Sequence, residues 1–167
     1  MQPFDAIDSL EGARALDPLA AGLQKLAAKV TSDPKRRAVM EGRPVGHSAH
    51  PMLVQMPIGA WVSAGLLDCV PRTHSAASFL TGVGLVTALP AIGTGLADYR
   101  HLDRRMRRVA VVHVAANTLS IAFQLASLRN RLAGRHSRGQ WIGLAGTTSL
   151  AVGGLLGGHM AHPLGRS

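Results

Sequence analysis

The chain is poor in cysteine, aromatic residues and charged residues, and each shortage excludes a class of protein. Among its 167 residues Cys69 is the only cysteine, so an internal disulfide framework and a zinc site built mainly on thiolates are excluded. Aromatic residues make up 4% of the chain, which leaves few large anchors for a soluble core. Charged residues make up 16%, against about 25% in an average soluble domain. That shortage argues against a disordered chain and against a coiled coil.

Four stretches of the sequence contain no Asp, Glu, Lys or Arg. They are Met52–Leu67, Phe79–Ala97, Val109–Leu128 and Trp141–Ala161. A helix needs roughly 20 residues to cross a hydrocarbon core of ~30 Å, and the last three stretches have about that length. The first reaches it when counted as Pro51–Val70. Because a helix of a soluble bundle would carry a charged outer face, the sequence predicts an all-α fold, a four-helix transmembrane bundle with spans at about 51–70, 79–97, 109–128 and 141–161.

The basic residues indicate how this bundle is oriented. Short connections make successive spans antiparallel, so both chain ends share one side with the loop Asp98–Arg108. That side carries twice as many Lys and Arg residues as the other, namely Lys35, Arg36, Arg37, Arg43, Arg100, Arg104, Arg105, Arg107, Arg108 and Arg166. The other side carries Arg72, Arg129, Arg131, Arg135 and Arg138. The positive-inside rule therefore predicts a multi-pass protein of the bacterial inner membrane with both termini in the cytoplasm.

The formal net charge of +9 does not indicate a nucleic-acid-binding protein. Such a protein would gather its basic residues, with some aromatic ones, on a single element. Here the basic residues are spread over the loops, where they are suited to anchoring in anionic lipid. We therefore expect the lipid bilayer as a partner and no nucleic acid, while homo-oligomerisation stays open.

Residues 1–45 predict a cytoplasmic amphipathic helical segment followed by a linker, and residues 46–167 the membrane domain. The first 30 residues contain acidic residues and no apolar core run, which argues against a secretory signal. Apolar residues recur there at helical spacing, at Leu16, Leu19, Leu23, Leu26 and Val30. Asp17 is the expected N-cap, with Pro18 at the first helical position. We expect this helix to lie on the inner surface of the membrane.

Ionisable side chains inside the expected spans predict a functional site, because such groups are expensive at membrane depth. His47 and His50 lie where the first span begins, and Asp98 lies where the second ends. His113 is in the second turn of the third span, and His159 is near the end of the fourth. Since successive spans alternate in direction, all five residues are expected at the cytoplasmic end of the bundle.

These residues predict a haem or metal site. Neutral imidazole is an axial ligand of haem, and two histidines from different helices can hold haem b inside a bundle. His113 is the first candidate ligand because it lies deepest, and His50 or His159 is its candidate partner. Asp98 and Asn117, which follows His113 on the same helical face, are expected to orient a ligand ring or bind the cofactor.

Two alternatives stay open beside haem. His50, His113 and His159 could hold a single non-haem metal ion such as zinc or iron, which would make this a metal-dependent membrane enzyme. The protein could instead be a structural or assembly subunit whose histidines bind nothing and only hydrogen-bond between helices. The sequence contains no G-x-S-x-G elbow, no phosphate-binding P-loop and no H-E-x-x-H motif, so a non-catalytic protein is favoured.

Several motifs resemble a bacterial membrane family, domain of unknown function 2231 (DUF2231). The opening Gly46-His47-x-x-His50-Pro51-x-Leu53-Val54-x-x-Pro57-Ile58-Gly59-Ala60-Trp61, followed by Leu67-Asp68, is similar to the start of that family. Thr94-Gly95-Leu96-Ala97-Asp98-Tyr99, His113-x-Ala115-Ala116-Asn117 and Gly157-Gly158-His159 resemble its later signatures. Some members carry a Rieske iron–sulfur domain after the last helix. The resemblance therefore implies membrane electron transfer, with a separate Rieske-type or other redox protein as the partner of this chain.

Overall fold

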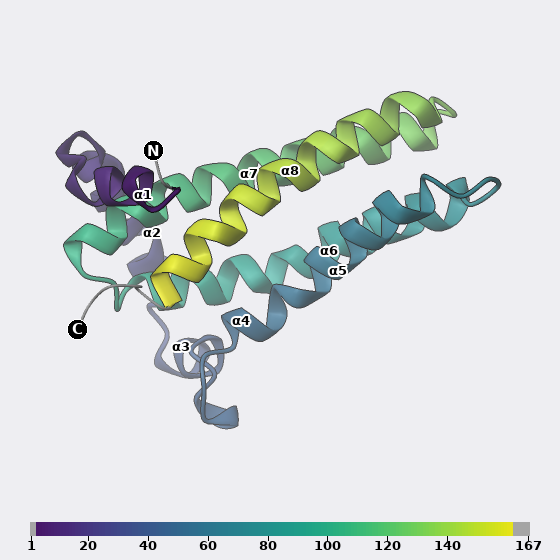
Figure 1. Cartoon of the computed structure of the whole chain (residues 1–167). Coiled ribbons are helices and arrows are strands. Elements are labelled where there is room, and N and C mark those ends of the chain that lie inside the picture. Colours follow the sequence, from purple (N-terminus) through teal and green to yellow (C-terminus); the bar gives the residue numbers. More distant parts are fainter. Residues whose placement is uncertain (1–2, 162–167) are drawn as a thin grey trace.

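The computed structural model describes residues 3–161, with side chains from residue 6 onward, and within that range it is helical without strands (Figure 1). The last part of the expected membrane domain, residues 162–167 with Arg166, lies outside the described residues. The helices in chain order are α1 (Pro3–Gly12), η1 (Arg14–Leu16), α2 (Asp17–Val30), α3 (Pro34–Met40), η2 (Arg43–Val45), α4 (His50–Leu53), α5 (Gln55–Leu67), α6 (His74–Tyr99), α7 (Arg104–Leu132) and α8 (His136–Ala161). The all-α prediction is confirmed for this part of the chain.

Three of the described helices are long and apolar enough to cross a membrane. Helices α6, α7 and α8 contain 26, 29 and 26 residues, and their most apolar windows have mean hydropathies of 1.6, 1.6 and 1.2. At most 28% of each window is buried inside the molecule, so large apolar side chains such as Phe79, Leu89 and Leu155 are exposed. An apolar surface of this extent is stable in lipid and not in water. The predicted transmembrane helices at 79–97, 109–128 and 141–161 lie within these three.

The first expected span, 51–70, is not a single helix. Helix α4 ends at Leu53 and α5 begins at Gln55, so the helical hydrogen-bond pattern is interrupted at Val54, although the backbone angles of Val54 stay helical. Pro57 explains the interruption, because it has no N–H to donate to the carbonyl of Leu53 four residues earlier. Helix α5 then ends at Leu67 after 13 residues, fewer than the roughly 20 needed to span alone. Pro90, in contrast, lies inside an unbroken α6.

The long helices form two hairpins, α5 with α6 and α7 with α8 (Figure 1). Glycines on α8 let α7 approach closely. A Cβ atom at Gly139 would lie 2.6 Å from Arg131 Cγ, and one at Gly143 would lie 3.0 Å from Ser127 Oγ. In the other hairpin the Trp61 ring packs on Gly84, and its Nε1 donates to the Thr81 carbonyl over 3.2 Å.

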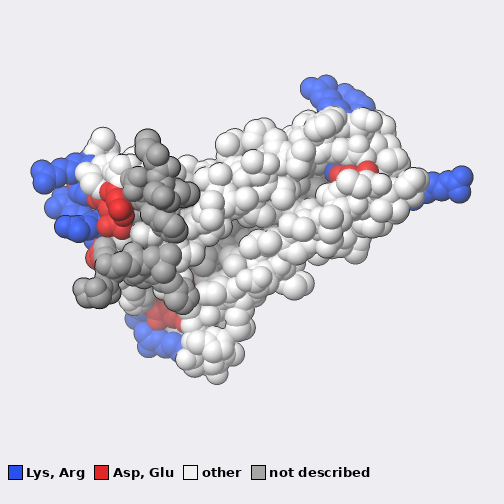
Figure 2. Space-filling model, in the orientation of Figure 1, with Lys and Arg blue, Asp and Glu red and all other residues white. Residues whose placement is uncertain are grey.

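The two ends of the molecule differ in what they carry. Figure 1 shows α1, the α6–α7 connection and the last turn of α8 at one end, which we call the terminal end, and the α5–α6 and α7–α8 turns at the other, the turn end. Figure 2 shows charged residues gathered at both ends, with a band free of them between. This arrangement is the one predicted from the short connections, and the cytoplasmic location of the terminal end stays a prediction.

A buried ion pair joins the two hairpins at the turn end. Arg131 of α7 donates from Nη1 to Oδ1 of Asp68, which follows α5, over 2.7 Å, and its Nη2 contacts Oδ2. The Arg131 Nε also donates to Ser127 Oγ over 3.1 Å. The Arg131 and Asp68 side chains are only 2% and 11% exposed. Each charge is therefore stabilised by the opposite charge of its partner and only weakly by water.

The N-terminal helices pack against the terminal end of the long helices. In α2, Ala27 is buried against Tyr99 and Ala110, and the Tyr99 hydroxyl donates to the Ala20 carbonyl over 2.9 Å. The expected role of Asp17 as an N-cap is wrong. Leu16 occupies that position without a side-chain hydrogen bond, and the Asp17 carboxylate instead accepts from Arg108 of α7. The positive charge of Arg108 binds this carboxylate more strongly than the N–H groups of its own helix do.

Candidate functional site

His113 lies on α7 with its ring held between α7 and α8. Its Nδ1 is 2.8 Å from the Gly153 carbonyl oxygen of α8. Because a carbonyl only accepts, Nδ1 carries the proton and Nε2 keeps its lone pair. The Asn117 amide, one turn later on α7, donates from Nδ2 to that Nε2 over 3.1 Å and also to the His113 carbonyl over 2.9 Å. The ring is therefore fixed in one tautomer by groups on two helices.

Glycines of α8 make room for these two side chains. A Cβ atom at Gly153 would lie 2.6 Å from Asn117 Oδ1, and one at Gly157 would lie 3.2 Å from His113 Cε1. Small residues commonly allow membrane helices to approach in this way. The glycine pairs of α8 thus accommodate polar side chains of α7 within the hairpin.

His50 lies at the start of α4 and is held against α6 in a similar way. Its Nδ1 is 2.9 Å from the Ala91 carbonyl oxygen, so this nitrogen is also the protonated one. The ring lies on Gly95, where a Cβ atom would be 2.9 Å from His50 Cε1. Within the described residues, no hydrogen bond reaches the Nε2 atom of His50. Its lone pair is therefore available.

His50 and His113 form the central pair of the candidate site. They come from different parts of the bundle, since His50 of α4 is held against α6 and His113 of α7 is held against α8. Each donates Nδ1–H to a backbone carbonyl of a neighbouring helix, which leaves Nε2 unprotonated. A histidine that binds a metal through one nitrogen usually donates its other N–H to such a carbonyl or to a carboxylate.

His159 of α8 lies at the same end but has a different partner. Its Nε2 is 3.0 Å from Oε1 of Glu11, at the end of α1, and its side chain is only 8% exposed. The contact ties the last turn of α8 to α1 and occupies one of the two ring nitrogens. Across residues 3–161 we find no group of three or more His, Cys, Asp or Glu side chains placed to hold a metal ion.

Among the residues that the structure describes, Asp98 and His47 form no hydrogen bond with His50 or His113 and instead contact Ser48. The Asp98 carboxylate accepts from the Ser48 hydroxyl over 2.6 Å, which links the end of α6 to the segment before α4. His47 is exposed. The structure thus brings all five candidate residues of the spans to the terminal end, as predicted, and sets Asn117 directly against His113.

Sequence reasoning did not identify Glu11 and Ser48 as partners of the candidate residues. Glu11 is 148 residues from His159, and Ser48 is 50 residues from Asp98. Neither partner shares a helical face or a spacing pattern with the residue that it contacts. No short-range signal predicts such pairs, because they depend on where α1 and the α4 segment pack.

Comparison with known proteins identifies one family. A family model described as "Predicted membrane protein (DUF2231)" matches residues 46–165, which includes every candidate site residue from His47 to His159. No curated protein and no solved structure matched the chain. The matched segment begins four residues before α4 and leaves α1, α2 and α3 outside it.

Proposed function

We propose a function from the premise that this chain belongs to the DUF2231 family of predicted membrane proteins. The protein is an integral membrane protein with three helices able to span a bilayer. We propose that it holds haem b through His50 and His113 at the terminal end of the bundle and that its role is membrane electron transfer. The observation that supports this most is that both imidazole rings have the same tautomer. Each is protonated on Nδ1, so the Nε2 lone pair is left to coordinate a metal.

The proposal includes a fourth membrane segment made of α4 and α5. Residues 50–67 would extend about 27 Å at 1.5 Å per helical residue, close to the hydrocarbon thickness. They contain no charged residue, and Met52, Met56 and Leu66 are exposed apolar side chains. Helix α5 packs along α6. A fourth segment accounts for the arrangement in which α1 and the last turn of α8 both lie at the terminal end.

The residues present are compatible with a haem held by two histidines. His50 and His113 would hold the haem through their Nε2 atoms, and for His113 this would replace the hydrogen bond from Asn117. The Ala91 and Gly153 carbonyls would keep both rings in the coordinating tautomer. Bound haem iron would supply one-electron chemistry. We expect the electron donor or acceptor to be a separate Rieske-type or other redox protein.

One observation favours a second candidate, a structural subunit without a cofactor. Several polar side chains of α7 have partners on α8. Gln124 donates to the Gly143 carbonyl, and Ser127 donates to the Gly139 carbonyl. His113 and Asn117 continue this pattern and would then serve only to hold the hairpin together. A single zinc or iron ion is the third candidate, and it would need ligands beyond His50 and His113.

Absorption spectra of the detergent-purified protein, oxidised and then reduced with dithionite, distinguish these candidates when combined with metal analysis. We expect a Soret band that shifts on reduction and is lost in His50→Ala and in His113→Gln. The glutamine amide can still donate to the Gly153 carbonyl, so His113→Gln removes the ligand while keeping the interhelical hydrogen bond. The matched control is His47→Ala, an exposed histidine at the same end, which should keep the band.

Each other result selects a different candidate. About one metal ion per chain without a haem spectrum would indicate the non-haem site. Neither haem nor metal, in protein expressed with both supplied, would contradict the proposal and leave the structural subunit.

A further inference from the structure

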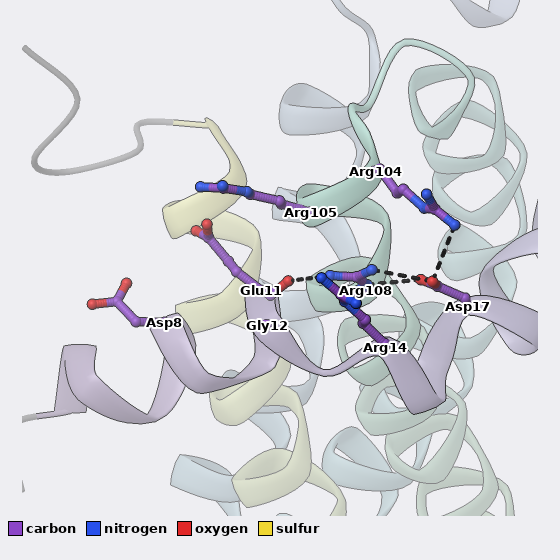
Figure 3. A pocket seen from close by; sticks show the side chains of 8 residues that line it. All are labelled: Asp8, Glu11, Gly12, Arg14, Asp17, Arg104, Arg105 and Arg108. Carbon is purple, nitrogen blue, oxygen red and sulfur yellow. Dashed lines mark hydrogen bonds and ion pairs between the residues drawn. The ribbon is translucent and has the colours of Figure 1, made fainter.

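An open cavity of about 800 Å³ lies at the terminal end, apart from the histidine pair. It is formed by α1, η1, the start of α2 and the first turns of α7 (Figure 3). Four arginines and three acidic residues dominate its lining, which consists of Asp8, Glu11, Gly12, Arg14, Asp17, Arg104, Arg105 and Arg108. A volume of this size is within the usual range of ligand pockets, roughly 300–1,000 Å³.

One wall of the cavity is fixed by Arg108. Its Nε donates to Asp17 Oδ1 over 2.7 Å, its Nη2 donates to Asp17 Oδ2 over 3.1 Å, and its Nη1 donates to the Glu11 carbonyl over 2.7 Å. The hydrogen bond from Arg108 holds the pKa of the Asp17 carboxyl below its usual value. Arg104 reaches the same carboxylate over 3.3 Å from a side chain that is 81% exposed. The charge of Asp17 is therefore satisfied from within the protein.

Arg14 and Arg105 are not fixed by a hydrogen bond, although the charge of Arg14 also acts on the Asp17 carboxylate. Within residues 3–161, neither forms a hydrogen bond or an ion pair, and both are exposed. Figure 3 shows Arg14 extending toward Arg108, and Arg105 extending from α7 on the side of Glu11. With four arginines and three carboxylates, the lining keeps one positive charge in excess, which favours an anionic ligand.

The position of the cavity along α7 indicates the depth of its ligand. Arg108 directly precedes Val109, where the charge-free run of α7 begins. The cavity therefore lies where the apolar band of the molecule meets its charged end (Figure 2). In a bilayer this is the level of the lipid headgroups.

We propose that this cavity binds a phosphate group, carried by the headgroup of an anionic phospholipid or by a soluble phosphate ester. The planar guanidinium fork matches phosphate oxygens and can bind them with two hydrogen bonds. Arg14 and Arg105 supply these donors, and the Asp8 carboxylate accepts from hydroxyl groups of a glycerol headgroup. The site does not depend on whether His50 and His113 bind haem.

Lipid binding by the full chain in detergent tests this inference. Native mass spectrometry would count adducts of dioleoylphosphatidylglycerol and of dioleoylphosphatidylcholine added in mixed micelles. We expect phosphatidylglycerol to bind more tightly, and the double variant Arg14→Gln/Arg105→Gln to weaken it by about fivefold per arginine, the equivalent of about 1 kcal/mol for each basic residue at a membrane surface. The control Arg135→Gln/Arg138→Gln removes two exposed charges from the turn end and should change binding less than twofold.

A parallel titration separates the two sources of phosphate. Sodium phosphate is compared with sodium chloride at equal ionic strength, with thermal stabilisation of the purified protein as the readout. Phosphatidylglycerol binding without a phosphate-specific effect identifies a lipid headgroup, and a phosphate-specific effect lost in Arg14→Gln/Arg105→Gln identifies a soluble ligand. Equal behaviour of wild type, the cavity variant and the turn-end control in both assays would overturn the inference.

Discussion

The ion pair between Asp68 and Arg131 makes a quantitative prediction about how the two hairpins are held together. Asp68→Asn keeps the shape of the side chain but removes its charge. Arg131 would then remain as a cation whose side chain is 2% exposed. Its other described hydrogen bond is the single one to Ser127. A buried charge without its counter-ion is far less stable than the intact pair.

The expected loss follows from the burial of both partners. Removing one partner of a buried pair costs about 3–5 kcal/mol. For a chain of this length each kcal/mol lowers the melting temperature by about 2–4 °C. We therefore expect Asp68→Asn to lower Tm by about 6–20 °C, measured from the tryptophan emission of the detergent-purified protein. The change in emission comes from Trp61, whose ring is buried against α6, because Trp141 is already 73% exposed in the folded protein.

Two further variants make the test specific. Adding Arg131→Met to Asp68→Asn removes the orphaned cation and should restore more than half of the lost stability, since replacing both partners of a buried pair is often close to neutral. Arg43→Gln breaks an ion pair with Glu41 in which Arg43 is 65% exposed, and it should cost less than about 1 kcal/mol. If Asp68→Asn melts within 2 °C of wild type, the pair is not buried as described and this reasoning is refuted.

Three other predictions follow from individual contacts. Gly84→Ala would place a Cβ 2.2 Å from Trp61 Nε1, so we expect a loss of about 1–3 kcal/mol and a red shift of tryptophan emission. Gly82→Ala would place its Cβ at an ordinary 3.8 Å from Leu128 Cδ2 and should show neither effect. Because Arg108 lowers the pKa of Asp17 in the folded protein, the contact stabilises the docking of α2 above the ordinary carboxyl pKa and is lost as pH falls through the lowered value. The protection of the α2 amides from hydrogen exchange, corrected for the intrinsic exchange rate at each pH, should therefore fall on acidification, and Asp17→Asn should remove that dependence. Cys69 is exposed at the turn end, so a membrane-impermeant maleimide should label it from outside in intact cells, and labelling only after permeabilisation would reverse the predicted orientation.

The long helices were predictable because each is marked by a continuous stretch of the sequence. An absence of charge over about 20 residues identifies α6, α7 and α8 without knowledge of their neighbours. The interruption at Val54 was not predictable in this way. Pro57 and Pro90 are both prolines inside apolar runs, yet α6 continues through Pro90. Whether a proline ends a helix depends on which neighbouring groups satisfy the freed carbonyl, and that is a property of the packed molecule.

The contacts within the candidate site were less predictable from the sequence than the residues that form it. Alternating spans predict that His50, Asp98, His113 and His159 share an end, and they do. The partners of His50 and His113 are backbone carbonyls, which every residue has, so no side-chain pattern indicates them. The α2 helix gives a related case. Its leucine stripe predicted a helix on the membrane surface, and nothing in the stripe indicated that the contact with α6 and α7 is made through small residues such as Ala27, with Leu19 and Leu26 exposed.

The central claim is that His50 and His113 together hold haem, and electron paramagnetic resonance of the oxidised protein tests it most directly. Haem with two histidine ligands gives a low-spin ferric signal, whereas loss of one ligand leaves a high-spin iron. We predict a low-spin signal in the wild type that becomes high-spin in His50→Ala and stays low-spin in His159→Ala. A wild-type protein with no haem signal, or a low-spin signal that survives His50→Ala and is lost in His159→Ala, would contradict the account.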